Sequence, residues 1–247
     1  MDYISEERYM TEKSSLQEIE SRFDNDVERF SNLDTGQLTT LDAKFNMDLI
    51  VESIVRCYPN LKNVLDIGCG AGNYSVRLLQ EISPIDIVLS DLSQPMLDKA
   101  KERVEALNQN EKVEVIKGDF RSLPVADESF DVIIATAVLH HLRDDADWES
   151  TFQMLHNKLR KGGSIWIFDL ITQASSPLQE LIYKQRYGEY LSALKDDAYR
   201  DHVFAYIEKE DSPRSLVYQL DLLKQVGFHS VDVLHKNLCF ASYVAFK

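Results

Sequence analysis

Three glycines and a carboxylate, clustered early in the chain, have the spacing of a ligand-binding turn. The segment NVLDIGCGAGNYS places Gly68, Gly70 and Gly72 directly after an apolar run that contains Asp66. Glycine at such a turn lets a ligand approach the backbone without meeting a side chain. A dinucleotide-binding turn would read G-x-G-x-x-G, whereas this one reads G-x-G-x-G. Because a nearby carboxylate repels phosphate, the turn favours a cationic or zwitterionic ligand.

Carboxylates also end the next two apolar runs. Asp91 follows IDIVLS, where a carboxylate can accept hydrogen bonds from both ribose hydroxyls. Asp119 follows KVEVIKG and can take an exocyclic amine, while Phe120 could lie against a purine face. Two of these residues also have a purely structural interpretation, Asp91 as a helix N-cap and Phe120 as part of the core. Their positions at successive run ends favour the ligand interpretation.

A regular alternation of elements must position these residues. Strand-like runs occupy 63–68, 85–91, 112–119, 130–139 and 162–171, and helical patterns occupy 46–58, 73–82, 94–107 and 147–159. This alternation predicts a doubly wound α/β domain, with a mostly parallel sheet and helices on both faces. The last two strand-like runs, 230–235 and 238–246, are too close for a crossover and should form an antiparallel hairpin.

The ends of the chain depart from this alternation. Residues 1–44 are charged and contain one amphipathic helical pattern at 15–33, which predicts a helical N-terminal arm. Residues 45–172 should form the ligand-binding core, and residues 173–212 a helical cap without strands. The last helix and the hairpin, within 213–247, should complete the core.

Composition and charge narrow the function further. The 247 residues carry a formal net charge of −14, which disfavours nucleic acid as a partner. Cys57, Cys69 and Cys239 have neither metal-site spacing nor the pattern of a disulfide framework, and the N-terminus is polar. We therefore expect a cytoplasmic protein with no signal peptide and no metal. No apolar run reaches the roughly 18 residues of a membrane span, so no membrane association is expected.

Five segments of the core carry a family resemblance. In order, VLDIGCGAGNYS, LSDLSQPML, KGDF, SFDVIIATAVLHHL and LRKGGSIWIFDL resemble the successive motifs of class I S-adenosylmethionine-dependent methyltransferases. The resemblance covers roughly residues 45–172. It implies a seven-stranded Rossmann-like sheet with a reversed last strand, S-adenosylmethionine as cofactor and S-adenosylhomocysteine as product.

By position, the resemblance assigns a set of residues to the cofactor. It implies that Gly68 and Gly70 contact the methionine part, while Asp66 supports the loop and the amino group. Asp91 would hold the ribose hydroxyls, with Leu92 beside the adenine. The remaining assignments are Asp119 and Phe120 around the adenine, Thr136, Ala137 and Val138 along the methionine and the sulfonium, and Cys69 and Met96 in the same site.

Methyl transfer needs little chemistry from the protein beyond alignment and the exclusion of water, because the methyl group is already activated. A nucleophile that starts protonated also needs a general base. His140 and His141 follow the fourth strand, near where the methyl group should point, and an imidazole can accept a proton near neutral pH. The alternative for each histidine is that it shapes the pocket and hydrogen-bonds nearby backbone.

The acceptor pocket should lie under the arm and the cap. SRFDNDVERFSNL resembles the F-D-x-x-A-x-x-Y-D arm of many small-molecule methyltransferases, with Phe30 in place of the tyrosine. Tyrosines and arginines of the cap could stack on and clamp an acceptor, or the aromatic residues could form the cap's own core. The cap could also carry a homodimer contact. The candidate acceptor residues are Phe23, Phe30, Arg186, Tyr187, Tyr199 and Arg200.

These observations together predict a methyltransferase that acts on a small molecule. The tail resembles that of the branch containing carboxy-S-adenosylmethionine synthases, which hold an extra carboxylate with an arginine and tyrosines. Arg200, beside Tyr199, could take that arginine's place. The alternatives are therefore an enzyme of that kind and a non-catalytic cofactor-binding module that regulates a partner. Nicotinamide-dependent oxidoreduction ranks lower, because the third glycine is displaced and the terminal hairpin is foreign to it.

Overall fold

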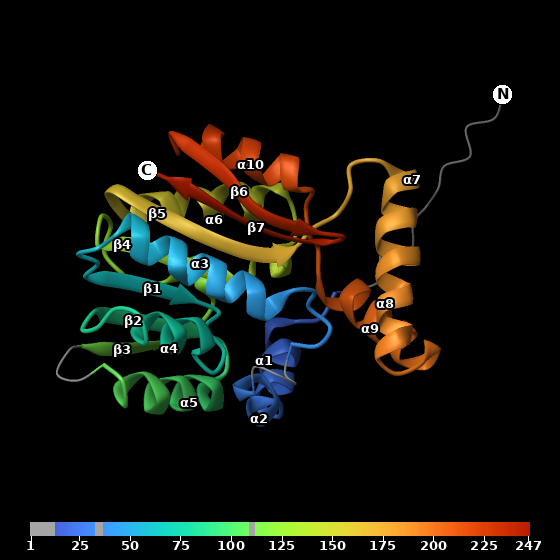
Figure 1. The fold of residues 1–247 in the computed structure, drawn as a ribbon, viewed down its shortest axis with the longest axis horizontal. Helices are drawn as coiled ribbons and strands as arrows, with labels where there is room; N and C mark the ends of the chain where they lie inside the picture. The colour runs from blue at the N-terminus through green and yellow to red at the C-terminus, as the bar shows by residue number, and fades with distance from the viewer. Residues whose placement is uncertain (1–12, 33–36, 109–111) are drawn as a thin grey trace.

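A seven-stranded sheet forms the centre of the protein (Figure 1). The computed structural model describes residues 13–32, 37–108 and 112–247, so residues 1–12 and 33–36 of the expected arm lie outside the described residues. In their order across the sheet, the strands are β3 (Val113–Lys117), β2 (Asp86–Asp91), β1 (Asn63–Ile67), β4 (Phe130–Thr136), β5 (Leu159–Leu170), β7 (Phe240–Phe246) and β6 (Ser230–Asn237).

The strand pairing confirms the predicted doubly wound sheet with a terminal hairpin. Strands β1 to β5 are parallel, whereas β7 pairs antiparallel with both β5 and β6. The winding reverses between β1 and β4, and in such sheets ligands bind beyond the carboxyl ends of the strands at this point. Strand β4 ends at Thr136, earlier than predicted, because Ala137 has a left-handed backbone with φ of 52°. A short 3-10 turn, η2 (Leu139–His141), follows it.

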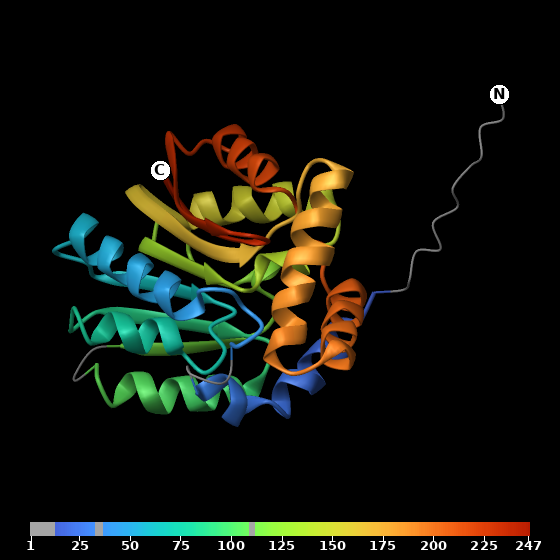
Figure 2. The same ribbon diagram turned by 45° about the vertical axis from the view of Figure 1, so that its right-hand side comes forward.

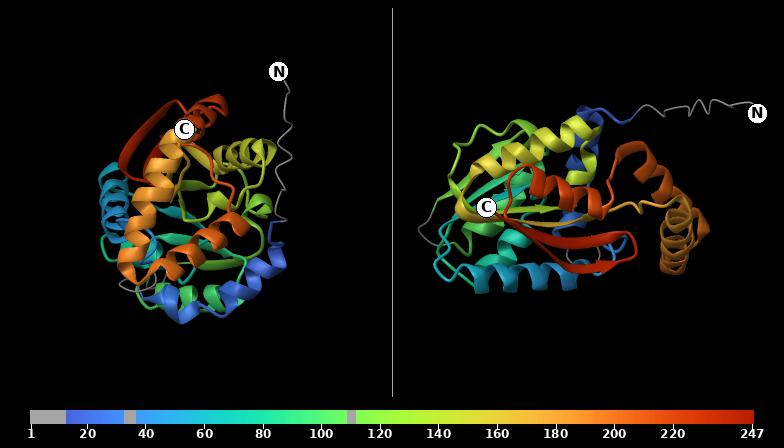
Figure 3. Two further views of the ribbon diagram at one scale, coloured as in Figure 1. Left: turned by 90° about the vertical axis from the view of Figure 1, so that its right-hand side faces the viewer. Right: turned by 90° about the horizontal axis from the view of Figure 1, so that it is seen from above.

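Helices cover both faces of the sheet (Figures 1 and 3). Neighbouring strand residues alternate between two cores: Ile134 and Trp166 face one core, and Ile133 and Ile165 face the other. This burial on both faces explains the continuous apolar runs that mark the strands. The first core includes residues of α3 (Ala43–Cys57), α4 (Asn73–Leu79) and α5 (Gln94–Glu105), and the second includes residues of α6 (Asp145–Lys158) and α10 (Leu216–Gln225).

The N-terminal arm forms two short helices, α1 (Leu16–Asp24) and α2 (Val27–Ser31), which pack against α5 (Figure 2). Ser15 caps α1 in a reciprocal capping box with Glu18. The helical pattern predicted as one stretch is interrupted at Asn25, whose backbone N–H donates back to the carbonyl groups of the last turn of α1.

The cap stands beyond the carboxyl ends of the parallel strands (Figures 2 and 3). It contains α7 (Ser176–Gln179), the π-helical segment η3 (Glu180–Tyr187), α8 (Gly188–Leu194) and α9 (Asp197–Glu210). The ring centroids of Tyr183 and Phe204 lie 4.9 Å apart, and those of Tyr187 and Phe240 lie 5.6 Å apart. These aromatic contacts give the cap a core of its own and join it to β7.

Candidate active site

The glycine loop turns sharply at the end of β1. Gly68 has φ of +61°, and a Cβ there would lie 2.4 Å from Cγ2 of Val138 in the loop after β4. The Cys69 backbone N–H donates to the Ser90 carbonyl oxygen at 3.0 Å, which ties the turn to β2. At Gly70 no atom of the described residues lies within 4 Å of where a Cβ would stand. The loop is therefore closely packed behind Gly68 and open to a ligand at Gly70.

The two carboxylates nearest this loop face different ways. Asp91 accepts hydrogen bonds from the backbone N–H groups of Gly70 and Ser93, both at 2.9 Å, and it lines a cavity beyond the strands. Asp66 is buried behind the loop, where it accepts a hydrogen bond from the Ser75 hydroxyl at 2.7 Å. Burial raises the pKa of Asp66 to about 7 and also raises the pKa of Asp91. The structure thus places Asp66 beneath the loop and Asp91 at the cavity.

Asp119 and Phe120 lie together at the end of β3, as the sequence predicts for strand-end residues. The carboxylate of Asp119 accepts from the Arg121 guanidinium, with Nε–Oδ2 at 2.8 Å. Arg121 also pairs with Asp147 at 3.0 Å. Arg121 was not predicted from the sequence, although it lines the same cavity. A ligand amine would therefore share the Asp119 carboxylate with this arginine.

These residues surround one cavity, which we call the cofactor cavity. Of the residues assigned to the cofactor from the sequence, Asp66 alone is not among those that line it. The arm covers the cavity and is anchored by two hydrogen bonds: the Ser93 hydroxyl donates to Asp24 at 2.6 Å, and the Asn73 amide donates to the Phe30 carbonyl oxygen at 2.8 Å. The lining residues predicted for the cofactor are Gly68, Cys69, Gly70, Asp91, Leu92, Met96, Asp119, Phe120, Thr136, Ala137 and Val138.

A second cavity, which we call the acceptor cavity, adjoins the first between the arm, the cap and the ends of β4 and β5. The candidate acceptor residues Phe23, Phe30, Tyr187 and Tyr199 line it, as do both histidines. The residues that line both cavities are Phe23, Phe30, Gln37, Ala137 and His141.

The structure does not bring Arg186 and Arg200 to the acceptor cavity. Arg186 pairs with Glu189 on the cap surface, and Arg200 pairs with Asp197 and Asp201. The arginines that line the cavity are instead two residues of the arm, Arg22 in α1 and Arg29 in α2.

His140 and His141 lie against two buried carboxylates. Nδ1 of His140 makes a short contact with Asp169 at the end of β5, and Nδ1 of His141 lies 3.3 Å from Oδ1 of Asp211. Burial alone would lower the pKa of His140, but Asp169 and Asp211 outweigh it and raise this pKa to about 9. Burial and the neighbouring His140 lower the pKa of His141. Neither carboxylate was predicted from the sequence, although Asp169 obeys the strand-end rule applied to Asp91.

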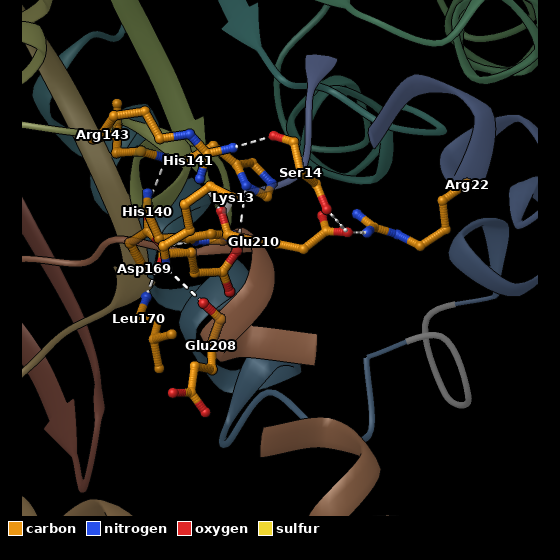
Figure 4. Close-up of polar contacts among 12 residues, drawn as sticks. Lys13, Ser14, Arg22, His140, His141, Arg143, Asp169, Leu170, Glu208 and Glu210 are labelled. Carbon is orange, nitrogen blue, oxygen red and sulfur yellow. Dashed lines mark hydrogen bonds and ion pairs between the residues drawn. The ribbon is translucent and has the colours of Figure 1, made fainter. Parts of the chain in front are cut away.

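The arm holds this histidine cluster in place from the side (Figure 4). Arg22 pairs with Glu210 at the end of α9, and the Ser14 hydroxyl donates to the same carboxylate at 3.2 Å. Arg143, two residues beyond His141, donates to the Ser14 carbonyl oxygen at 2.8 Å. Hydrogen bonds and an ion pair thereby connect the arm, the loop after β4 and the end of the cap.

Several known proteins are similar to this chain in sequence or fold. The sequence profile described as a methyltransferase domain matches residues 64–163. A demethylmenaquinone methyltransferase from Lactobacillus johnsonii is 26% identical over 182 residues, which are 70% of each chain. A carboxy-S-adenosyl-L-methionine synthase from Nautilia profundicola is 22% identical over 96% of this chain and 100% of its own. The solved structure of an S-adenosylmethionine-dependent methyltransferase from Thermotoga maritima, described as a possible histamine N-methyltransferase, has a TM-score of 0.57 at 22% identity and covers 93% of this chain and 99% of that chain.

The fold and the strand-end cavity are those of a Rossmann-like domain. The methyltransferase-domain match and the relatives support a class I S-adenosylmethionine-dependent methyltransferase, an enzyme that uses S-adenosylmethionine and releases S-adenosylhomocysteine. This confirms the family, fold and cofactor predicted from the sequence. Among the described residues, no helix is both long enough and apolar enough to span a membrane.

Proposed function

We propose that the enzyme transfers the methyl group of S-adenosylmethionine, held in the cofactor cavity, to a small molecule held in the acceptor cavity. The observation that carries the proposal is the shared wall between the cavities. Ala137 and His141 line both of them, from the loop after β4. A methyl group presented at this wall would face an acceptor in the adjoining cavity.

Residues of the cofactor cavity suit S-adenosylmethionine chemically. The open backbone at Gly70 leaves room for the amino-acid end, and Asp91 is fixed by two backbone donors where a ribose would lie. Leu92, Met96 and Phe120 give an apolar surface for the adenine. When bound, the cofactor supplies a methyl group activated by the sulfonium. The chain's own residues then have to orient that group and exclude water.

We assign the acceptor to the space between the arm, residues 1–44, and the cap, residues 173–212, with residues 45–172 and 213–247 forming the cofactor-binding body. Tyr199 and Arg22 offer a ring and a guanidinium to an acceptor in this cavity. His140 and His141 would act on its nucleophilic atom. The relatives named for demethylmenaquinone and histamine support a small acceptor. We further propose that the enzyme works in the cytoplasm and that the cap can mediate a homodimer.

Transfer of a labelled methyl group tests the proposal. The protein is incubated with S-adenosylmethionine carrying a labelled methyl and a cell extract separated by size. Label should enter the small-molecule fraction with the wild-type protein and far less with Asp91→Asn. The matched control is Asp98→Asn, which changes an exposed aspartate of α5 and should behave as wild type. Cofactor binding without methyl transfer to any fraction would favour the alternative that the protein is a non-catalytic cofactor-binding module that regulates a partner.

The second candidate is a carboxy-S-adenosylmethionine synthase-like enzyme. The alignment with the Nautilia profundicola synthase along that protein's whole length favours it. The surface position of Arg200 weighs against the particular residue match from the sequence. Mass spectrometry of the ligand released from purified protein separates the candidates: an extra carboxylate mass supports the synthase, and S-adenosylmethionine or S-adenosylhomocysteine supports the methyltransferase.

A further inference from the structure

We propose that His140, His141 and Asp211 bind a divalent transition-metal ion at the wall of the acceptor cavity. The role given to the ion rests on the proposed function, whereas the metal site itself does not. No metal was expected from the sequence. The three side chains can place one ligand atom each within 4.8 Å of the other two. All three line the acceptor cavity, so an ion there would face the acceptor.

The spacing of the ligand atoms suits a metal ion. Oδ1 of Asp211 lies 3.3 Å from Nδ1 of His141 and 3.7 Å from Nε2 of His140. Two donors at about 2.1 Å from a tetrahedral ion lie about 3.4 Å apart. The two distances from Asp211 to the histidines are therefore within a few tenths of an ångström of those around a bound ion, and all three ligand atoms lie within 4.8 Å of one another.

Two of these ligand atoms are buried without a hydrogen bond. Nδ1 of His141 and Oδ1 of Asp211 are each shielded from solvent, and neither has a hydrogen-bond partner among the described residues, although they face one another. The Asp211 side chain is only 3% exposed. Buried polar atoms in proteins are normally satisfied, so such a pair points to a missing partner. A cation between them would satisfy both.

The residues behind the cluster have the arrangement of a metal-site support. The other ring nitrogen of His140, Nδ1, contacts the buried carboxylate of Asp169, and this leaves Nε2 directed toward Asp211. Metal-binding histidines commonly use a carboxylate in this way to fix their orientation. The Ser212 backbone N–H donates to the His140 carbonyl oxygen at 2.7 Å, which holds Asp211 beside the histidines.

The carboxylates of the cluster have no lysine or arginine as a direct partner. The side chains of Asp169 and Asp211 are both buried, and within the described residues no lysine or arginine forms an ion pair with either carboxylate, although Lys13 donates to the Asp211 carbonyl oxygen at 2.6 Å. A buried carboxylate needs a compensating charge. That charge is supplied either by protons on the histidines or by a metal ion. Two histidines and one carboxylate suit zinc or iron(II) and leave positions open for another ligand.

An ion at this place would act on the acceptor. A hydroxyl or thiol bound to it would lose its proton more easily, and the resulting anion would be held against the shared wall. The nucleophile would then attack the methyl carbon, the carbon–sulfur bond would break, and its electrons would remain on the sulfur. The proton released by the acceptor would pass to solvent.

Metal titration without cofactor or acceptor tests this inference. Untagged protein is treated with a chelator and dialysed, and Zn²⁺ is then titrated in against a coloured competitor. One ion should bind per chain, at least tenfold more weakly to His141→Ala and Asp211→Asn. Asp169→Asn should weaken binding by about 10- to 100-fold through its support of His140. The control is His235→Ala. This histidine does not line the cavity, and its Nε2 lies 2.9 Å from Oδ2 of Asp42.

The same variants keep the outcomes distinct. Co²⁺ should give visible absorption bands typical of nitrogen and oxygen ligands, and these bands should disappear in His141→Ala. Urea unfolding shows whether each variant is folded. Methyl transfer by the wild-type protein, measured separately, shows whether the proposed function holds. Absence of Zn²⁺ binding by the wild-type protein, or equal binding by Asp211→Asn, would overturn the metal site and leave the protonated-histidine interpretation.

Discussion

The backbone N–H of Gly70 donates to Oδ2 of Asp91 at 2.9 Å and so joins the loop after β1 to the end of β2. The other oxygen of this carboxylate accepts from the Ser93 N–H. Two motifs that are separate in the sequence are thereby one structural unit. The carboxylate predicted to hold the ribose also fixes the loop predicted to hold the methionine part.

Asp91→Asn should weaken S-adenosylmethionine binding by about 10- to 100-fold. The amide has a single acceptor oxygen, so a ribose hydroxyl would compete with a backbone donor for it, and the hydrogen bond lost on binding would cost about 1–3 kcal/mol. Calorimetric titration with the cofactor measures the effect, with Asp98→Asn as the control. Equal affinity of Asp91→Asn and the wild type would remove Asp91 from the cofactor site.

Gly68→Ala should destabilise the fold by about 2 kcal/mol or more, because it adds both backbone strain and a clash with Val138. Gly162→Ala is the matched control: its φ is +79°, but no atom lies within 4 Å of the added Cβ. Gly162→Ala should therefore lower the free energy of unfolding only through backbone strain. Urea unfolding measures both, and Gly68→Ala should be the more destabilising of the two. Equal losses in the two variants would mean that the clash with Val138 is not a cause.

Stability should fall as the pH rises from about 4 to 7, in part because of Asp66. Burial raises the pKa of its carboxyl to about 7, so the folded protein keeps this proton to a higher pH than the unfolded chain does. The stability that Asp66 contributes therefore decreases between about pH 4 and pH 7 and does not change further above pH 7. Unfolding free energies at pH 5 and pH 8 should therefore differ less in Asp66→Asn than in the wild type. An unchanged pH difference would contradict this reasoning.

Arg186→Ala and Arg200→Ala should each leave the KM for the acceptor within about twofold of the wild-type value, because exposed ion pairs contribute little. Tyr199→Ala should raise this KM by tenfold or more, since its ring lines the acceptor cavity. Initial rates on the acceptor found by methyl labelling provide the comparison. A large increase in KM for Arg200→Ala would instead mean that Arg200 contacts the acceptor.

The sequence predicts those parts of the site that depend on local rules. Asp91 and Asp119 end strands of one parallel sheet, so the alternation of elements was enough to bring them to one edge. Arg186 and Arg200 were misplaced because each is next to a tyrosine that points inward. Successive residues of a helix point in directions about 100° apart, so a neighbour of a buried tyrosine faces elsewhere.

Contacts between distant segments could not be predicted in this way. Asp211 follows the last cap helix and contacts His141 only because the chain returns there from the cap. No local sequence pattern in either segment predicts this contact. Arg22 could have been found by helical spacing, since it lies three residues after Ile19, the buried residue of α1. Its partner Glu210 ends α9, far along the chain, and becomes evident only when the arm packs against the cap.

The most direct measurement of the central claim is a crystal structure with S-adenosylhomocysteine bound. We predict that the adenine lies beside Phe120 and that the ribose hydroxyls contact Asp91. The sulfur should then face the wall formed by Ala137 and His141, toward the acceptor cavity. A sulfur directed away from that wall, or a ligand bound outside the cofactor cavity, would contradict the account.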